Sequence, residues 1–134
     1  MLPYGDMKLE GLRKLAQENV KGNPFSAKII ENSTGRYVVA VNQVDAKMDP
    51  TAHAEIEAIR KAGEEDFDFE DSTIYCSGEP CPMCAVAIAW AGIKKVYYLD
   101  SYKIAKDGGF KLDQDVHQVN KLLNLGLEIK QLKE

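Results

Sequence analysis

The sequence predicts an α/β protein, a three-layer α/β/α arrangement built on a mixed sheet of about five strands. Strand-forming runs alternate along the chain with runs whose apolar residues recur every three or four positions, which is typical of helices packed on both faces of one sheet. The 134 residues are 45% hydrophobic, which is enough for one core. We therefore expect residues 1–134 to form a single domain.

The N-terminal third of the chain predicts one helix and a β-hairpin. Apolar residues recur at helical spacing over residues 7–20, and a glycine and a proline follow that stop the helix. Residues 25–31 and 37–41 are strand-forming, and they flank a polar turn that ends at Gly35. An amphipathic helix followed by two antiparallel strands is the expected structure.

The middle of the chain predicts a helix, an acidic loop and a strand. Thr51 is the predicted N-cap of a helix from Ala52 to Ala62, and Gly63 is its predicted end. Residues 64–71 are acidic and predict an exposed loop. Residues 73–76 then favour a strand.

The C-terminal part predicts a helix, a strand, a helix and a last strand. The alanine-rich residues 81–91 predict a helix that Gly92 terminates. Residues 94–99 and 127–132 are strand-forming, and a helical pattern lies between them at residues 116–123. Because the connection is long and contains a helix, it suits parallel strands rather than a hairpin.

Four residues with metal-binding or acid/base chemistry fall at the starts of two of these helices. Cys81 and Cys84 are three residues apart, so a helix places them on one face, and a helix N-terminus favours the thiolate that binds metal. With His53 they supply three ligands, one fewer than a closed structural zinc site uses, which leaves a position for water. Glu55 points to another side of its helix and can exchange a proton with that water.

Two other interpretations of the cysteines explain the pattern less completely than this open zinc site. A structural zinc site could be completed by Cys76 as a fourth ligand, but it would leave Glu55 without a role. A redox-active C-x-x-C motif would have no use for the His53-x-Glu55 pair. Three cysteines in all are too few for a disulfide scaffold.

The two motifs together resemble a known enzyme signature. His53-Ala54-Glu55 and Pro80-Cys81-Pro82-Met83-Cys84 are similar to the H-x-E and P-C-x-x-C halves of the zinc nucleobase deaminase signature, and the similarity runs from about Phe25 to Leu99. The sequence is identified as a member of the cytidine deaminase-like superfamily. This resemblance implies hydrolytic deamination with release of ammonia, Zn²⁺ held by His53, Cys81 and Cys84, and Glu55 as the general acid/base.

The resemblance also implies three substrate contacts. Asn42 matches the position of an asparagine that holds the base in several branches of the superfamily. Phe25 matches a position in the pocket wall, and Ala54 lies between the ligand His53 and the acid Glu55. We expect Asn42, Phe25 and Ala54 to contact the substrate.

The substrate is expected to be a free purine, with guanine converted to xanthine. The segment Glu79–Cys84 and Trp90 are most similar to the bacterial guanine deaminases. Two departures weaken that assignment: Lys111-Leu112 stands where those enzymes carry an acidic pair, and the C-terminus lacks their aromatic residue. Cytosine or cytidine deamination, tRNA adenosine deamination and an inactive zinc-stabilised binding module therefore remain alternatives.

Charge and hydropathy limit the kinds of partner that the sequence predicts. The chain has 17 Lys and Arg against 21 Asp and Glu, a net charge of −4 without a basic stripe, which favours a small nucleobase over a nucleic acid. No signal-peptide pattern and no membrane-length apolar run is found, so a cytoplasmic protein without a membrane partner is expected. The superfamily resemblance implies a homo-oligomer, most simply a dimer. Trp90 is expected in the core or at the subunit interface.

Overall fold

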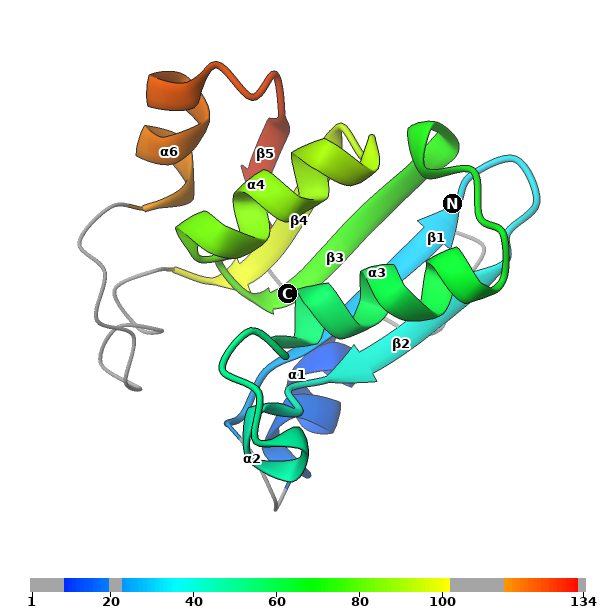
Figure 1. Cartoon of the computed structure of the whole chain (residues 1–134), viewed down its shortest axis with the longest axis vertical. Helices are drawn as coiled ribbons and strands as arrows, with labels where there is room; N and C mark the ends of the chain where they lie inside the picture. Colours follow the sequence, from blue (N-terminus) through cyan, green and yellow to red (C-terminus); the bar gives the residue numbers. More distant parts are fainter. Residues whose placement is uncertain (1–8, 20–22, 102–114, 133–134) are drawn as a thin grey trace.

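The structure is a computed structural model that describes residues 9–19, 23–101 and 115–132. One five-stranded mixed sheet forms its centre, in the order β2-β1-β3-β4-β5 (Figure 1). The strands are β1 Ser26–Glu31, β2 Tyr37–Val41, β3 Ser72–Gly78, β4 Lys95–Asp100 and β5 Glu128–Gln131. β1 is antiparallel to both β2 and β3, whereas β3, β4 and β5 run parallel, which confirms the predicted mixed sheet.

Helices cover both faces of the sheet, as the three-layer prediction requires. The helices are α1 Leu9–Gln17, α2 Val44–Lys47, α3 Ala54–Glu64, α4 Pro82–Ala91 and α6 Val116–Leu123, with a short 3₁₀ turn at Phe69–Asp71. α3 and α4 lie across one face (Figure 1), where alternate strand residues such as Ile29 and Ile74 enter the main core cluster. Leu12 of α1 packs with Ile30 and Tyr75 on the other face.

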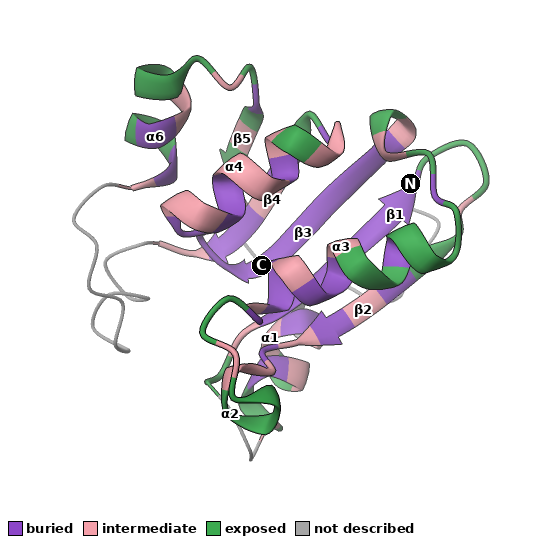
Figure 2. Cartoon of the chain, in the orientation of Figure 1, coloured by how far each residue is buried: buried purple, intermediate pink, exposed green. Residues whose placement is uncertain are grey.

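The central strands are buried on both sides because helices cover both faces of the sheet. Every residue of β1 and β3 is buried, whereas buried residues of the edge strand β2 alternate with exposed or half-buried ones (Figure 2). A strand covered on both faces needs no polar side, which is why strand-forming residues run continuously through β3. The C-terminal end of β3, a central strand, leads directly into the C-x-x-C motif.

The second predicted helix begins later and ends later than its sequence indicates. The N-cap of α3 is His53 and not Thr51, because the Thr51 hydroxyl donates to Asp49 Oδ1 over 2.7 Å instead of capping the helix. α3 also continues through Gly63 to Glu64, so the prediction that Gly63 ends it is wrong. The later start places His53 in extended backbone immediately before the helix, where its side chain is free to leave the helix surface.

The C-terminal half agrees with the prediction at the points that shape the site. α4 ends at Gly92, whose φ of +107° is the left-handed conformation that favours glycine. α6 connects two parallel strands, and its N-terminus carries a capping box made by Asp115 and Gln118. α2 was not predicted.

Trp90 is the clearest departure in this half. It is 90% exposed at the outer side of α4, so the alternative that placed it in the core is wrong. Lys111-Leu112, on which the substrate assignment partly depended, lies outside the described residues. Within the described ranges, none of the helices is long and apolar enough to span a bilayer.

Candidate metal centre

Two helix N-termini meet at the candidate metal centre. His53 is the N-cap of α3, and Cys81 is the N-cap of α4 with Cys84 in its first turn. The His53 side chain makes no capping hydrogen bond to α3, so it can reach the cysteines of α4 across the gap between the helices.

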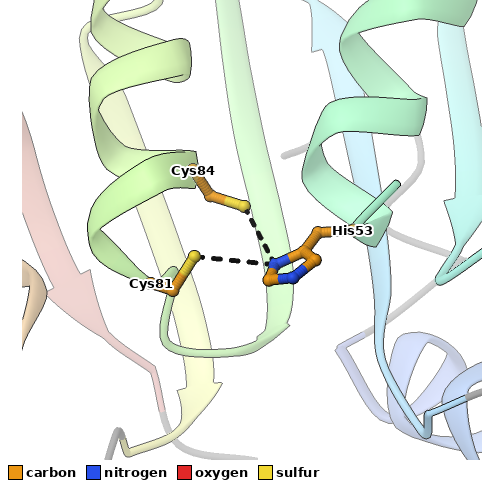
Figure 3. Close-up of side chains that lie close together, drawn as sticks. All are labelled: His53, Cys81 and Cys84. Atoms are coloured by element: carbon orange, nitrogen blue, oxygen red, sulfur yellow. Dashed lines mark hydrogen bonds between the residues drawn. The ribbon is translucent and has the colours of Figure 1, made fainter. Parts of the chain in front are cut away.

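The three predicted ligands point toward one another (Figure 3). His53 Nδ1 lies 3.5 Å from Cys81 Sγ and 3.5 Å from Cys84 Sγ, and the ligand atoms of all three residues fall within 4.8 Å of one another. Bonds of about 2.3 Å from zinc to sulfur and about 2.0 Å to nitrogen, at a tetrahedral angle, place the two atoms about 3.5 Å apart. The donor set and its spacing therefore fit one zinc ion.

The described residues do not support a fourth protein ligand. The group that could hold a metal there consists of His53, Cys81 and Cys84, and it includes neither Cys76 nor Glu55. Cys76 lies buried in β3, where burial and the nearby Glu55 charge raise the pKa of its thiol well above the ordinary value. The alternative of a closed structural site completed by Cys76 is therefore wrong, because the group that could hold a metal among the described residues has three members.

The electrostatics of the cluster favour one thiolate. Hydrogen bonding from Cys84, followed by that from His53, lowers the pKa of Cys81 to about 4 against an opposing effect of burial. The pKa of Cys84 is raised, first by burial and then by its bond to Cys81. The bond to Cys81 raises the pKa of His53. Cys81 is thus a thiolate that accepts hydrogen bonds from two neighbouring groups. A divalent cation would displace the protons of those groups and bind to the same negative charge.

Glu55 lies beside the three ligands as a buried acid. It is 6% exposed, and its carboxyl group is hydrogen-bonded to Cys84. Burial, and after it the negative charge of Cys81, raises the pKa of Glu55 to about 7. A carboxyl group in this range gains and loses protons readily at neutral pH.

Asn42 is held on several sides by hydrogen bonds. Its Oδ1 accepts from the Val44 N–H over 3.0 Å, and its own N–H donates to the Phe25 carbonyl over 3.0 Å. The next N–H, of Gln43, donates to the Ala52 carbonyl over 2.8 Å, which ties the end of β2 to the residues just before His53. Since Oδ1 is engaged, Nδ2 is the end of the Asn42 amide that can donate to a ligand.

Ala54 belongs to the main core cluster, and Phe25 packs against that cluster. The Phe25 ring is so close to Gly78, the last residue of β3, that a Cβ there would meet it at 3.0 Å. Ala54 is the first residue of α3 and is fully buried between His53 and Glu55 in the chain. Phe25 and Asn42 are thus joined by a backbone hydrogen bond, and Phe25 lies against the end of the strand that leads into the C-x-x-C motif.

Glu79 is a buried charge to which the sequence analysis assigned no role. It is 4% exposed and precedes Pro80-Cys81, and its Oε2 accepts from the Val116 N–H over 2.8 Å. The sequence feature that could have indicated a role for Glu79 is a charged residue in a loop otherwise made of proline and cysteine. Its partner, 37 residues away, was not visible in the pattern.

This geometry can be compared with known proteins. Residues 8–100 match the family model described as the cytidine and deoxycytidylate deaminase zinc-binding region, and the match contains His53, Glu55, Cys81 and Cys84. The chain belongs to this family. The family match confirms the superfamily assignment and the zinc-binding character of the ligand group.

Individual relatives show how far the similarity extends. A guanine deaminase of Bacillus subtilis is 42% identical over 93 residues, which are 66% of this chain and 58% of the relative. A deoxycytidylate deaminase of Enterobacteria phage T4 is 39% identical over 80 residues, 57% of this chain and 42% of the relative. The crystal structure of the Bacillus subtilis guanine deaminase superposes with a TM-score of 0.71 at 39% identity, over 79% of this chain and 70% of that one. The match thus spans about half the length of the two curated relatives.

Proposed function

We propose that this chain hydrolyses the amino group of a free nucleobase, with guanine as the first substrate and xanthine and ammonia as products. The observation that carries the proposal is the meeting of three ligand side chains at zinc-binding distance beside a buried acid that is not a ligand. A structural zinc site has no need of that acid. A hydrolytic site needs both the open coordination position and the proton carrier.

Metal binding and proton transfer are assigned to different residues. His53, Cys81 and Cys84 would hold Zn²⁺, which when bound there supplies an activated water. Glu55 takes one proton from the attacking water and delivers it to the departing amine. A bond from oxygen to the ring carbon forms, the bond from that carbon to nitrogen breaks, and ammonia leaves. The buried position of Glu55 keeps its carboxyl group from exchanging these protons with bulk solvent.

Asn42, Phe25 and Ala54 are proposed to hold the base. Because Asn42 Oδ1 accepts from Val44, its Nδ2 donates to an acceptor of the base, a carbonyl oxygen or a ring nitrogen. Phe25 supplies an apolar ring next to the end of β3, and Ala54 supplies a small buried surface between His53 and Glu55. A planar base fits such a combination of one polar clamp and apolar walls.

Guanine is placed before other bases because of the similarity to the guanine deaminase of Bacillus subtilis. The test is a panel of guanine, adenine, cytosine, cytidine and a tRNA anticodon stem-loop, with ammonia release measured for zinc-loaded protein. We expect guanine to be deaminated with the highest kcat/KM. Preference for cytosine, cytidine or the tRNA would overturn the substrate, and no ammonia from any of them would overturn the reaction.

The role of Glu55 is tested in the same assay. Glu55→Gln keeps the shape of the side chain but cannot carry the proton, so we expect kcat to fall by roughly 10²- to 10⁴-fold while zinc content stays at one ion per chain. Glu57→Gln is the matched control, because Glu57 is equally buried in the same helix but pairs with Lys47 over 2.8 Å. Activity that survives Glu55→Gln would contradict the mechanism.

We also propose that the chain forms a homodimer through the outer face of α4. This helix is apolar all round, yet Met83, Val86 and Ala87 are only half-buried and Trp90 is 90% exposed. A helix of that composition is normally covered on every side. Light scattering of Trp90→Glu should show a shift toward monomer, whereas Met48→Glu, at an equally exposed apolar residue after α2, should leave the mass unchanged.

A further inference from the structure

Glu79 joins the loop before Cys81 to both ends of the connection between β4 and α6. Its backbone N–H donates to the carbonyl of Asp100, the last residue of β4, over 2.8 Å. Its carboxylate Oε2 accepts from the N–H of Val116, the first residue of α6, over 2.8 Å. One residue therefore links the metal-ligand loop to two elements that lie far beyond it in the sequence.

The bond to Val116 satisfies a group that would otherwise be orphaned. The first N–H groups of a helix have no partner within the helix, and Val116 is fully buried. Asp115 caps the N–H of Gln118, so the N–H of Val116 needs an acceptor from elsewhere in the fold. The partial positive charge at the helix N-terminus in turn stabilises the buried Glu79 carboxylate.

A second contact to Glu79 comes from Tyr98 of β4. The Tyr98 hydroxyl is hydrogen-bonded to Glu79 and lies 2.8 Å from Nε2 of His117. Burial first, and then the charge of Glu79 and its hydrogen bond, raise the pKa of Tyr98 to about 12, so the hydroxyl remains a donor. The carboxylate is thus held from two elements, and removing it would leave the Val116 N–H buried without its acceptor.

Two prolines restrict the backbone that connects Glu79 to the ligand Cys81. Pro80 has a fixed φ angle between Glu79 and Cys81, and Pro82 restricts Cys81, the residue before it, to the extended backbone that Cys81 adopts with a ψ of 168°. Few freely rotating bonds therefore separate Glu79 from the Cys81 sulfur. A displacement of Glu79 is therefore expected to shift Cys81 relative to His53 and Cys84.

We propose that Glu79 is a positioning residue for the zinc site, and that it sets the place of Cys81 by anchoring the ligand loop to β4 and to the N-terminus of α6. The proposal rests on the zinc site and not on the identity of the substrate. Partners that orient metal ligands typically change metal affinity by about 10- to 100-fold when they are removed. Glu79 is not in the group of residues that could hold the metal, so its expected effect is on metal affinity through the position of Cys81.

Zinc affinity, measured by competition with a chromogenic chelator, tests the proposal without any assay of activity. We expect Glu79→Ala to bind zinc roughly tenfold or more weakly. Glu79→Gln keeps an oxygen that accepts from Val116 N–H and should bind within about threefold of the unchanged protein. An equal loss in both variants would contradict the hydrogen-bond account.

A second variant tests the same bond from its other side. Val116→Pro removes the donor, and proline suits the first position of a helix, while the ψ of 170° at Asp115 is the extended conformation that must precede a proline. We expect a loss of zinc affinity in the same range as for Glu79→Ala. This variant keeps the proposal testable if Glu79→Ala does not fold.

The control separates positioning from general loss of stability. Val119→Ala removes buried packing from the same helix without touching Glu79, so its Tm should fall while its zinc affinity stays within about threefold. Two results would overturn the proposal: unchanged zinc affinity in Glu79→Ala or Val116→Pro, or an equal loss of affinity in Val119→Ala. Absence of guanine deamination with these zinc affinities intact would instead count against the proposed function alone.

Discussion

The side-chain amide of Asn19 holds the backbone of Asn42 in place. Its Nδ2 donates to the Asn42 carbonyl over 3.0 Å and to the Asn23 carbonyl over 3.1 Å. Asn19 follows α1, so a helix on the face of the sheet away from the zinc ligands fixes the end of β2 that carries the proposed substrate contact. The two faces of the sheet are connected at this point.

We expect Asn19→Ala to weaken binding of the base more than it slows the chemical step. Loss of the amide leaves the Asn42 carbonyl without its donor, which costs about 1 kcal/mol and corresponds to a roughly three- to tenfold higher KM with kcat nearly unchanged. Gln17→Ala, at an exposed residue at the end of α1, serves as the control and should leave both constants unchanged. An equal fall in kcat and kcat/KM for Asn19→Ala would contradict a role through Asn42.

Gly78 accommodates the Phe25 ring at the end of β3. A Cβ at Gly78 would lie 3.0 Å from the ring, so Gly78→Ala forces the ring to move or the strand to shift. Overpacking of this kind costs about 1–3 kcal/mol, and we expect a lower Tm together with a lower kcat/KM because Phe25 is a proposed wall of the substrate site. Thermal unfolding and steady-state kinetics measure the two effects. The double variant Gly78→Ala/Phe25→Leu should recover most of the Tm, and failure to do so would show that the ring is not the obstacle.

Zinc should stabilise the fold through its three ligands. A ligand at about 100 times its Kd adds about 2.7 kcal/mol to the free energy of unfolding, so we expect zinc to raise the Tm by roughly 5–10 °C and a chelator to reverse this rise. Cys84→Ser should abolish the zinc-dependent shift. Cys76→Ser, at a buried cysteine outside the ligand group, should retain it, and loss of the shift there would restore Cys76 as a ligand.

The ion pair between the buried Glu31 and the exposed Arg36 predicts how stability changes with acid. Hydrogen bonds from Arg36 first, then from the Asp68 N–H and Thr34, lower the pKa of Glu31 from 4.5 to about 2. The unfolded chain therefore binds a proton at a higher pH than the folded one, so this contribution to stability is complete above about pH 4.5 and is lost as the pH falls toward about 2.

Urea unfolding of Glu31→Gln tests that dependence. We expect the variant to be less stable than the unchanged protein at about pH 7, and the difference to shrink at about pH 3, where the unfolded carboxyl group is protonated. The measurement at each pH compares the two proteins under identical conditions, which removes the effect of other titrating groups. A difference that stays constant or grows in acid would contradict the assignment.

Gly63 is a site where the helix α3 can be stabilised. It lies inside the helix, and a Cβ there would approach the Phe69 ring no closer than 3.9 Å. Gly63→Ala should therefore raise the free energy of unfolding by about 0.5–1 kcal/mol. Gly126→Ala is the matched control, since its φ of +72° disfavours any side chain although no atom obstructs the Cβ, and it should destabilise by about 1 kcal/mol.

Gly63 and Gly92 show which feature of a helix end a local sequence pattern does not predict. Gly63 and Gly92 follow helical runs alike, and both were predicted to end a helix. Gly92 does so with a φ of +107°, whereas Gly63 is helical and α3 runs on to Glu64. The sign of φ depends on where tertiary packing directs the chain next, which a local pattern does not contain.

The same limit explains the start of α3. Thr51 is a good N-cap by residue type, but its hydroxyl bonds to Asp49, and His53 takes the cap position. The parallel connection through α6 was predicted correctly because it depends on length and periodicity alone. Elements with strong hydrophobic periodicity were therefore predicted correctly, whereas local hydrogen bonds such as that of Thr51 determined where a helix begins.

The sequence by itself determined the chemistry of the site: two cysteines three residues apart at a helix start, a histidine at another helix start, and an acid two residues beyond it. Such spacings act within a single turn, so they need no knowledge of the rest of the chain. Only the tertiary structure decided that His53 lies 3.5 Å from both sulfurs, and that Asn19 and Glu79 anchor the loops around them. Those contacts join residues up to 37 positions apart, and they exist because the sheet order brings the ends of separate strands and helices together.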